Sequence, residues 1–311
     1  MPQPTSTTSP SHYIGRFAPS PTGPLHFGSL LAALASFLDA RAHNGQWLVR
    51  IEDIDPPREV AGASRAILNC LHAHGLEWDG DVLYQSQRLA VYQKICAQLI
   101  EQHRAFYCTC SRLDLAANDG VYAGRCRQCF DQPQQPAAIR LRVDAVDIDI
   151  SDRIQPAFTE NIARDVGDFV IYRKDQLPAY QLAVVIDDAA QYVTHIVRGS
   201  DLLESTARQI FLQRCLNLLT PQYAHIPVIV NSQQQKLSKQ TLARALDPAN
   251  AIENLLAALE CLHQPLPPQT LQQSRSDILD WAVRHWNIAL IARQPDIGIN
   301  ELPARCRAFI D

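Results

Sequence analysis

Lysine is scarce in this chain of 311 residues, and arginine supplies nearly all of its positive charge. Only four lysines occur, at positions 94, 174, 236 and 239, and two of them lie within one pentapeptide. A lysine carries a compact, mobile point charge that suits the binding of phosphate groups. Two of four lysines in one short polar segment therefore indicate a phosphate-binding loop at residues 236–240.

The sequence also lacks long apolar runs and any excess of positive charge. No run approaches the roughly 18 apolar residues of a membrane span, so we expect no membrane association. Residues 1–11 lack the basic start and apolar stretch of a signal peptide, which predicts a disordered tail on a cytoplasmic protein. A net charge of −4 argues against binding nucleic acid by bulk electrostatics, although a local patch would suffice for an RNA partner.

A second phosphate site is predicted near the start of the chain. Residues 16–29 read RFAPSPTGPLHFGS, which is the end of an apolar strand, a Pro/Gly turn, and then His26 and Gly28 at the start of a helix. The glycine lets the backbone approach a nucleotide, and a helix N-terminus offers free N–H groups and a positive dipole. A lone histidine would more often be structural, but this context favours a functional one.

These two segments together resemble the signature motifs of class I aminoacyl-tRNA synthetases, and the RFAPSPTG lead-in resembles the glutamyl/glutaminyl branch. The resemblance runs from about Tyr13 to about Thr241 and is strongest to short paralogues within that branch. Ser29 stands in place of the second histidine of the first motif. Leu237 and Gln240 stand in place of the methionine and final serine of the second. None of these changes removes a phosphate-binding group.

Alternation of strand and helix patterns predicts an α/β fold, and the resemblance implies a Rossmann-type catalytic domain with a zinc-binding insertion. We expect this domain at residues 12–107 and 137–247, the insertion at 108–136 and a helical region at 248–311. An amphipathic helix is predicted at 28–43. Strands near 138–143, 169–173 and 193–197 are expected to continue one parallel sheet.

The resemblance also implies the substrate site. An amino acid with a side-chain carboxylate needs an arginine for that group and an acid for its ammonium. Without the resemblance, Tyr180 would read as a core aromatic residue and Arg198 as a surface ion-pair partner. The implied L-glutamate residues are Arg16, Ala18, Ser20, Glu52, Tyr180 and Arg198. The implied ATP residues are Pro19, His26, Gly28, Lys236, Ser238 and Lys239, of which His26 and Lys239 are the expected catalytic pair.

Four of the nine cysteines lie close together in the sequence, at Cys108, Cys110, Cys126 and Cys129. Their spacing alone suggests one structural zinc ion with four thiolate ligands, and unmetallated thiols are the plain alternative. The resemblance instead implies the ligands Cys108, Cys110, Tyr122 and Cys126, with Cys129 spare. The scattered cysteines are expected to be small core residues: Cys70, Cys96, Cys215, Cys261 and Cys306.

The implied activity is activation of L-glutamate by ATP, with Mg²⁺ and without a need for tRNA. The short paralogues then attach glutamate to the queuosine base in the anticodon of tRNA(Asp). Only residues 241–311 follow the lysine loop, which leaves no room for the large anticodon-binding domain of the related synthetases. Two alternatives stay open: a truncated glutamyl-tRNA synthetase that charges the acceptor end, and a non-catalytic zinc-containing RNA-binding module. A monomer is expected.

Overall fold

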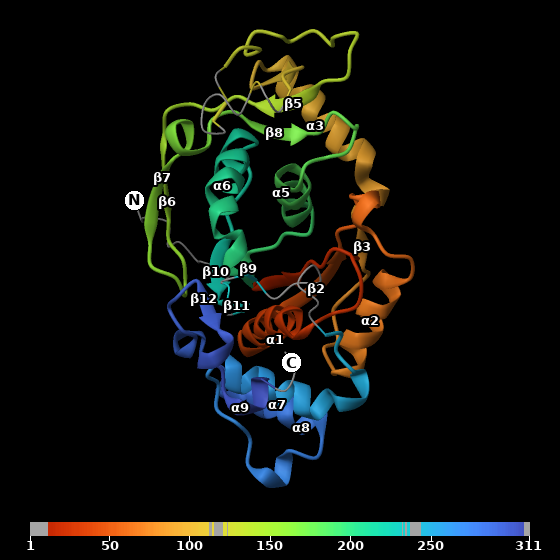
Figure 1. Ribbon diagram of the computed structural model, residues 1–311, viewed down its shortest axis with the longest axis vertical. Helices are drawn as coiled ribbons and strands as arrows, with labels where there is room; N and C mark the ends of the chain where they lie inside the picture. Colours follow the sequence, from red (N-terminus) through yellow and green to blue (C-terminus); the bar gives the residue numbers. More distant parts are fainter. Residues whose placement is uncertain are drawn as a thin grey trace, which may run out of the picture.

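The computed structural model describes residues 12–111, 114, 121–122, 124–231, 233, 235–236 and 244–307. A parallel sheet lies at its centre (Figure 1). Its strands are β1 (Ile14–Phe17), β2 (Gln46–Ile51), β3 (Leu83–Tyr84), β9 (His195–Gly199) and β10 (Gln222–Ile226). β1 pairs with β2, β2 with β3 and β9 with β10, all parallel. The Thr194 N–H donates to the Ile14 carbonyl at 2.9 Å, which places β9 beside β1 and the carboxyl ends of the strands at one edge.

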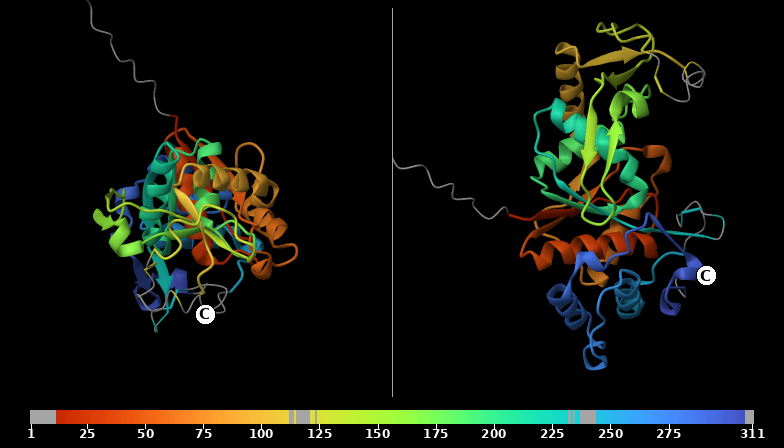
Figure 2. Two further views of the ribbon diagram at one scale, coloured as in Figure 1. Left: turned by 90° about the horizontal axis from the view of Figure 1, so that it is seen from above. Right: turned by 90° about the vertical axis from the view of Figure 1, so that its left-hand side faces the viewer.

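Helices cover both faces of this sheet. α1 (Phe27–Ala42) lies on one face, and α5 (Tyr180–Ala190) and α6 (Thr206–Cys215) lie on the other (Figures 1 and 2). The prediction of an amphipathic helix for α1 is wrong, because residues on most of its sides are buried, including Ala33, Leu34 and Ala40. The reason is that C-terminal helices cover the face of α1 that points away from the sheet, and a helix enclosed on all sides needs no polar stripe.

Beyond α5 and α6, the strands do not continue the parallel sheet as expected. β4 (Ala105–Cys108), β5 (Ala138–Leu141) and β8 (Phe169–Tyr172) form an antiparallel sheet, which packs against α3 (Leu89–Glu101) and α5. β6 (Asp147–Ile150) and β7 (Phe158–Asn161) form an antiparallel hairpin that the sequence patterns did not indicate. Apolar periodicity identifies a strand but gives neither its partner nor its direction, so the parallel assignment failed here.

The C-terminal region lies against α1. It contains α7 (Ala251–Cys261), α8 (Arg275–His285) and α9 (Ala304–Arg307), with α7 and α8 packed directly on α1 (Figure 2). The region is not purely helical as predicted, because β12 (Asp296–Gly298) pairs parallel with β11 (Val228–Val230). Three residues between turns are too short for a sequence pattern to reveal. This pairing ties the C-terminal region to the strand that leads into the lysine loop.

α2 (Ala63–Ala73) follows β2 along the chain. The five scattered cysteines are all buried, which confirms them as core residues. Among the residues that the structure describes, no helix is both long enough and apolar enough to cross a membrane.

Candidate active site

A cleft of about 880 Å³ opens at the carboxyl edge of the parallel sheet, where ligands of such sheets bind. It joins the ends of β1, β2 and β9 to the start of α1 and to the lysine segment. Every predicted substrate residue within the described ranges lines this one cleft: Arg16, Ala18, Pro19, Ser20, His26, Gly28, Glu52, Tyr180, Arg198 and Lys236. Residues from distant parts of the sequence therefore meet at one place.

The N-terminus of α1 lies at the cleft, which is lined there by Leu25, His26, Gly28 and Ser29. His26 is the N-cap residue, and its Nδ1 accepts a hydrogen bond from the Ser29 N–H at 3.3 Å. Gly28 keeps the space beside this ring open, since a β-carbon at that position would lie 3.2 Å from His26 Cε1. The first turn of α1 carries no acidic residue, so its positive dipole is available to an anion such as a phosphate group.

The lysine segment returns to the histidine motif. Lys236 forms a β-bridge with Val230, and its Nζ donates to Asp201 Oδ2 at 2.6 Å although the side chain is 43% exposed. Further along the chain, Ala245 bridges His26, and the Leu246 N–H donates to the Leu25 carbonyl at 2.9 Å. The two ends of the lysine loop therefore flank the cleft. The predicted ATP residues Ser238 and Lys239 lie outside the described residues.

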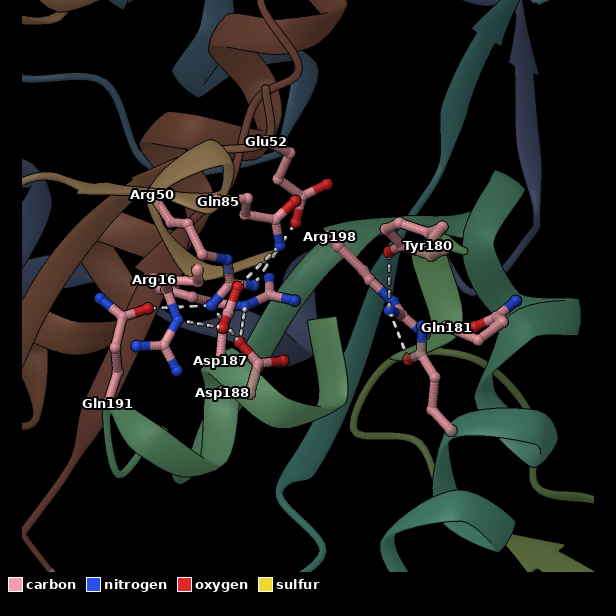
Figure 3. Close-up of polar contacts among 12 residues, drawn as sticks. Arg16, Arg50, Glu52, Gln85, Tyr180, Gln181, Asp187, Asp188, Gln191 and Arg198 are labelled. Atoms are coloured by element: carbon pink, nitrogen blue, oxygen red, sulfur yellow. Dashed lines mark hydrogen bonds and ion pairs between the residues drawn. The ribbon is translucent and has the colours of Figure 1, made fainter. Parts of the chain in front are cut away.

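A cluster of buried charges lies at one wall of the cleft, which Arg16 and Glu52 line and behind which Arg50 and Asp188 lie (Figure 3). Arg16 Nε lies 3.2 Å from Asp188 Oδ1, and Arg50 lies 2.8 Å from the same oxygen. Arg50 also lies 3.5 Å from Glu52 Oε1 and donates to Gln191 Oε1 at 2.9 Å. Arg50 and Asp188 were not among the predicted site residues. The sequence features that could have identified them are a single arginine inside the apolar strand β2 and an acidic pair inside the apolar helix α5.

The pKa values of the two carboxylates in this cluster, Glu52 and Asp188, are shifted in opposite directions. Burial raises the pKa of Glu52, and the nearby charges of Arg50 and Arg16 only partly offset that effect. Burial alone would also raise the pKa of Asp188, but Arg16 and Arg50 hold it below its usual range. Asp188 is therefore a permanent anion that fixes the two arginines, whereas Glu52 gains from an additional cation at the cleft.

A second arginine group lies across the cleft. Arg198 is 4% exposed and donates to five acceptors among the described residues, none of which is a carboxylate. These acceptors are His225 Nε2 at 2.9 Å, Gln209 Oε1 at 2.8 Å, Thr206 Oγ1 at 3.0 Å, the Leu202 carbonyl at 3.2 Å and the Tyr180 hydroxyl at 3.4 Å. Figure 3 shows Arg198 beside Tyr180. A buried guanidinium with neutral partners keeps its charge for an anionic ligand.

Three cysteines outside the cleft are close enough to hold a metal ion. The sulfur atoms of Cys108, Cys110 and Cys126 all lie within 4.8 Å of one another, and those of Cys110 and Cys126 are 3.6 Å apart. Tetrahedral zinc with bonds of about 2.3 Å holds its sulfur ligands about 3.8 Å apart, so the spacing fits. Although burial raises the pKa of Cys126, hydrogen bonds from Tyr122, Thr109 and Cys110 outweigh it and lower this pKa to about 7, which favours the thiolate.

Comparisons with known proteins agree with this geometry. Residues 14–250 match the family described as "tRNA synthetases class I (E and Q), catalytic domain". The chain is 53% identical over 286 residues to the glutamyl-Q tRNA(Asp) synthetase of Neisseria meningitidis, covering 89% of this chain and 96% of that one. It is 50% identical over 283 residues to the protein of the same name from Pseudomonas aeruginosa, covering 91% and 96%.

The solved structures confirm the expected class I α/β fold. A glutamate tRNA ligase from Elizabethkingia meningosepticum, crystallised with its amino acid, superimposes with a TM-score of 0.78 at 22% identity. The superposition covers 96% of this chain and 69% of the ligase. The chain belongs to the glutamyl and glutaminyl branch of the class I tRNA synthetases and, within that branch, to the glutamyl-Q tRNA(Asp) synthetase family.

Proposed function

We propose that this protein is a ligase that activates L-glutamate with ATP and then transfers the glutamyl group to queuosine in the anticodon of tRNA(Asp). The observation that carries the proposal is the shared cleft, in which a helix N-terminus suited to phosphate faces buried arginines and a carboxylate suited to an acidic amino acid. The family membership and the name of the relatives support the same activity. Because its proposed substrates include ATP and tRNA(Asp), we infer a cytoplasmic protein, and a monomer remains our expectation.

Glutamate binding is assigned to the charged walls of the cleft. The charge of Arg198, which no carboxylate of the described residues neutralises, suits one substrate carboxylate together with the Tyr180 hydroxyl, and Arg16 suits the other. Glu52 suits the ammonium group, because a cation there relieves the cost of its burial. The backbone and side chain of the turn after β1, at Ala18 and Ser20, complete the proposed contacts.

ATP binding is assigned to the start of α1 and to the lysine segment. Pro19, His26 and Gly28 would contact the nucleotide, with His26 next to the α-phosphate. Lys236 is paired with Asp201, so we infer that it exchanges this partner for a phosphate when ATP binds. Ser238 and Lys239 are proposed to complete the phosphate contacts, with Lys239 as a catalytic residue and Mg²⁺ accompanying ATP.

The proposed chemistry has two steps. An oxygen of the glutamate α-carboxylate attacks the α-phosphorus of ATP, the bond to the β-phosphate oxygen breaks, and pyrophosphate leaves. A queuosine hydroxyl then attacks the carbonyl carbon of the adenylate, AMP leaves, and the hydroxyl proton passes to solvent or to the leaving phosphate. Because both nucleophiles belong to substrates, the protein contributes positioning and electrostatic stabilisation.

Pyrophosphate exchange tests the first step. The purified protein should exchange labelled pyrophosphate into ATP when glutamate is present and tRNA is not, and should fail to do so with glutamine or aspartate. Exchange separates both enzymatic readings from a non-catalytic zinc-containing RNA-binding module. If a thermal unfolding measurement shows that the protein is folded and it still lacks glutamate-dependent exchange, that result would support the module instead.

The zinc ligands are proposed to be Cys108, Cys110, Tyr122 and Cys126. The Tyr122 hydroxyl lies 3.9 Å from Cys110 Sγ and accepts the Cys126 N–H at 2.6 Å. The Arg140 guanidinium stacks 4.4 Å from the centre of the Tyr122 ring. Burial raises the pKa of Tyr122, so a bound metal ion would be needed to hold it as a phenolate. Cys129 is exposed and does not join the three sulfur atoms that lie within ligand distance.

Metal analysis of two cysteine variants should separate the ligand sets. Cys129→Ser is expected to keep one zinc per chain, because the three clustered thiolates and Tyr122 remain. Cys110→Ser is expected to lose most of its zinc and, with it, order around residues 108–129, since a structural zinc site contributes directly to folding. Loss of zinc from Cys129→Ser would favour four cysteine ligands and exclude Tyr122.

A further inference from the structure

Two buried residues outside the lining of the cleft hold Arg198 from behind. His225 Nε2 accepts the Arg198 Nε–H at 2.9 Å, and the other ring nitrogen of His225 lies 2.6 Å from Asp152 Oδ2. The side chains of His225 and Asp152 are both fully buried. The second oxygen of Asp152 accepts three backbone N–H groups, from Ile154 at 2.9 Å, Gln155 at 2.8 Å and His225 at 3.1 Å.

The backbone explains why these residues meet. Arg198 and His225 are register partners in the adjacent parallel strands β9 and β10. Asp152 forms a β-bridge with Tyr223, two residues before His225 in β10, so its carboxylate reaches the imidazole from the next segment. The resulting hydrogen-bond chain runs from Asp152 through His225 to Arg198, which lines the cleft. Two of its members, Arg198 and His225, are themselves residues of the central sheet.

This hydrogen-bond chain fixes which nitrogen of His225 carries the proton. Asp152 accepts from Nδ1, so the lone pair on Nε2 faces the Arg198 donor. With the opposite tautomer, two N–H groups would face each other at 2.9 Å. Burial lowers the pKa of His225 and the Arg198 charge lowers it further, against the opposing effect of Asp152, so the ring stays neutral. Arg198 is thereby held in one plane by a neutral acceptor that leaves its charge undiminished.

We propose that Asp152 and His225 are positioning residues that set the affinity for glutamate by orienting Arg198. This inference rests on the proposed role of Arg198 in binding a substrate carboxylate. Neither residue touches the substrate. Their effect is on the direction of the guanidinium, because the hydrogen bond to His225 fixes the arginine plane. That plane also sets the position of the terminal nitrogen that lies 3.4 Å from the Tyr180 hydroxyl at the cleft. Disturbing them should therefore weaken glutamate binding and leave ATP binding alone.

Asp152→Asn tests the proposal with almost no change of shape. The asparagine oxygen can still accept the three backbone N–H groups, while its amide nitrogen faces His225 Nδ1 and forces the proton onto Nε2. The KM for glutamate in pyrophosphate exchange should rise about tenfold to a hundredfold, the range typical when a hydrogen bond behind a metal-ligating side chain is lost. The KM for ATP should stay within about twofold of wild type. A purely structural role would reduce the active fraction, and hence kcat, without this selective change in KM.

A conservative pair at position 225 gives a second readout that does not depend on one variant folding. His225→Gln keeps an oxygen that can accept from Arg198, whereas His225→Leu fills similar space with no acceptor. The glutamine variant should retain a lower KM for glutamate than the leucine variant. Equal values for the two would contradict the requirement for an acceptor.

Asp168→Asn is the matched control. Asp168 is also buried, accepts a backbone N–H from Val143 at 2.9 Å and pairs with Arg127 at 2.7 Å, but it does not line the cleft. This variant should lose stability and keep the wild-type KM for glutamate. Wild-type protein without glutamate-dependent exchange would overturn the proposed function. Active wild type together with an unchanged KM in Asp152→Asn would overturn this inference alone.

Discussion

Replacing Arg16 by alanine is expected to lower kcat/KM for glutamate in pyrophosphate exchange by about a hundredfold or more. Removing one partner of a buried, hydrogen-bonded charge pair costs roughly 2–5 kcal/mol. Arg16 is 4% exposed and lines the cleft, and its hydrogen bond to Asp188 is made through Nε. In the proposed complex its two terminal nitrogens form the fork that receives a substrate carboxylate.

The fold should survive this substitution. Asp188 keeps its second partner, Arg50, at 2.8 Å, so no buried carboxylate is left unpaired. Arg41→Ala is a suitable control, because it breaks another arginine–aspartate pair, with Asp79 at 2.7 Å, that lies outside the cleft lining. Thermal unfolding of both variants, measured beside their exchange kinetics, separates lost binding from lost folding. Wild-type kcat/KM in Arg16→Ala would mean that the assigned pocket is wrong.

Queuosine is expected to decide whether a tRNA accepts glutamate at all. The modified base supplies the hydroxyl that attacks the adenylate in the proposed second step, so a tRNA without it offers no acceptor. Recognition of a base turned out of a single-stranded loop is the usual way in which proteins read RNA sequence. A protein of net charge −4 is also poorly suited to hold a whole tRNA by general electrostatics.

Transfer of labelled glutamate should therefore differ between tRNA samples that are otherwise the same. tRNA(Asp) from cells that make queuosine should accept glutamate, whereas tRNA(Asp) from cells that lack it, and tRNA(Glu), should accept almost none. Periodate treatment cannot replace this comparison, since it cleaves the vicinal diols of both queuosine and the terminal ribose. Equal transfer to queuosine-free tRNA(Asp) or tRNA(Glu) would support a truncated glutamyl-tRNA synthetase.

The sequence predicted the members of the cleft better than the architecture around it. Local motifs carry their own geometry, since a strand, a tight turn and a helix start fix where residues 16–29 place His26 and Gly28. The direction of β5 and β8 and the hairpin of β6 and β7 depend instead on contacts between distant segments. The apolar periodicity of one strand does not identify its partner or its direction, so the predicted parallel sheet was too large.

The residues that sequence reasoning missed are those whose importance depends on a partner. Arg50 and Asp188 lie 138 positions apart and meet only because β2 and α5 pack together. His225 and Asp152 meet because β10 bridges the segment after β6. A charged residue inside a buried strand or helix was the available signal in Arg50 and Asp188, because burial of a charge requires a partner. The identity of that partner required the fold.

The position of the glutamyl group on the tRNA tests the central claim most directly. tRNA(Asp) that carries queuosine would be charged with labelled glutamate by this protein and then cut by nuclease into an anticodon fragment and a 3′-terminal fragment. The proposed function predicts that the label is found on the anticodon fragment and that the terminal adenosine carries none. Label on the terminal adenosine would contradict it, because the acceptor end, and not the anticodon loop, would then have entered the active site.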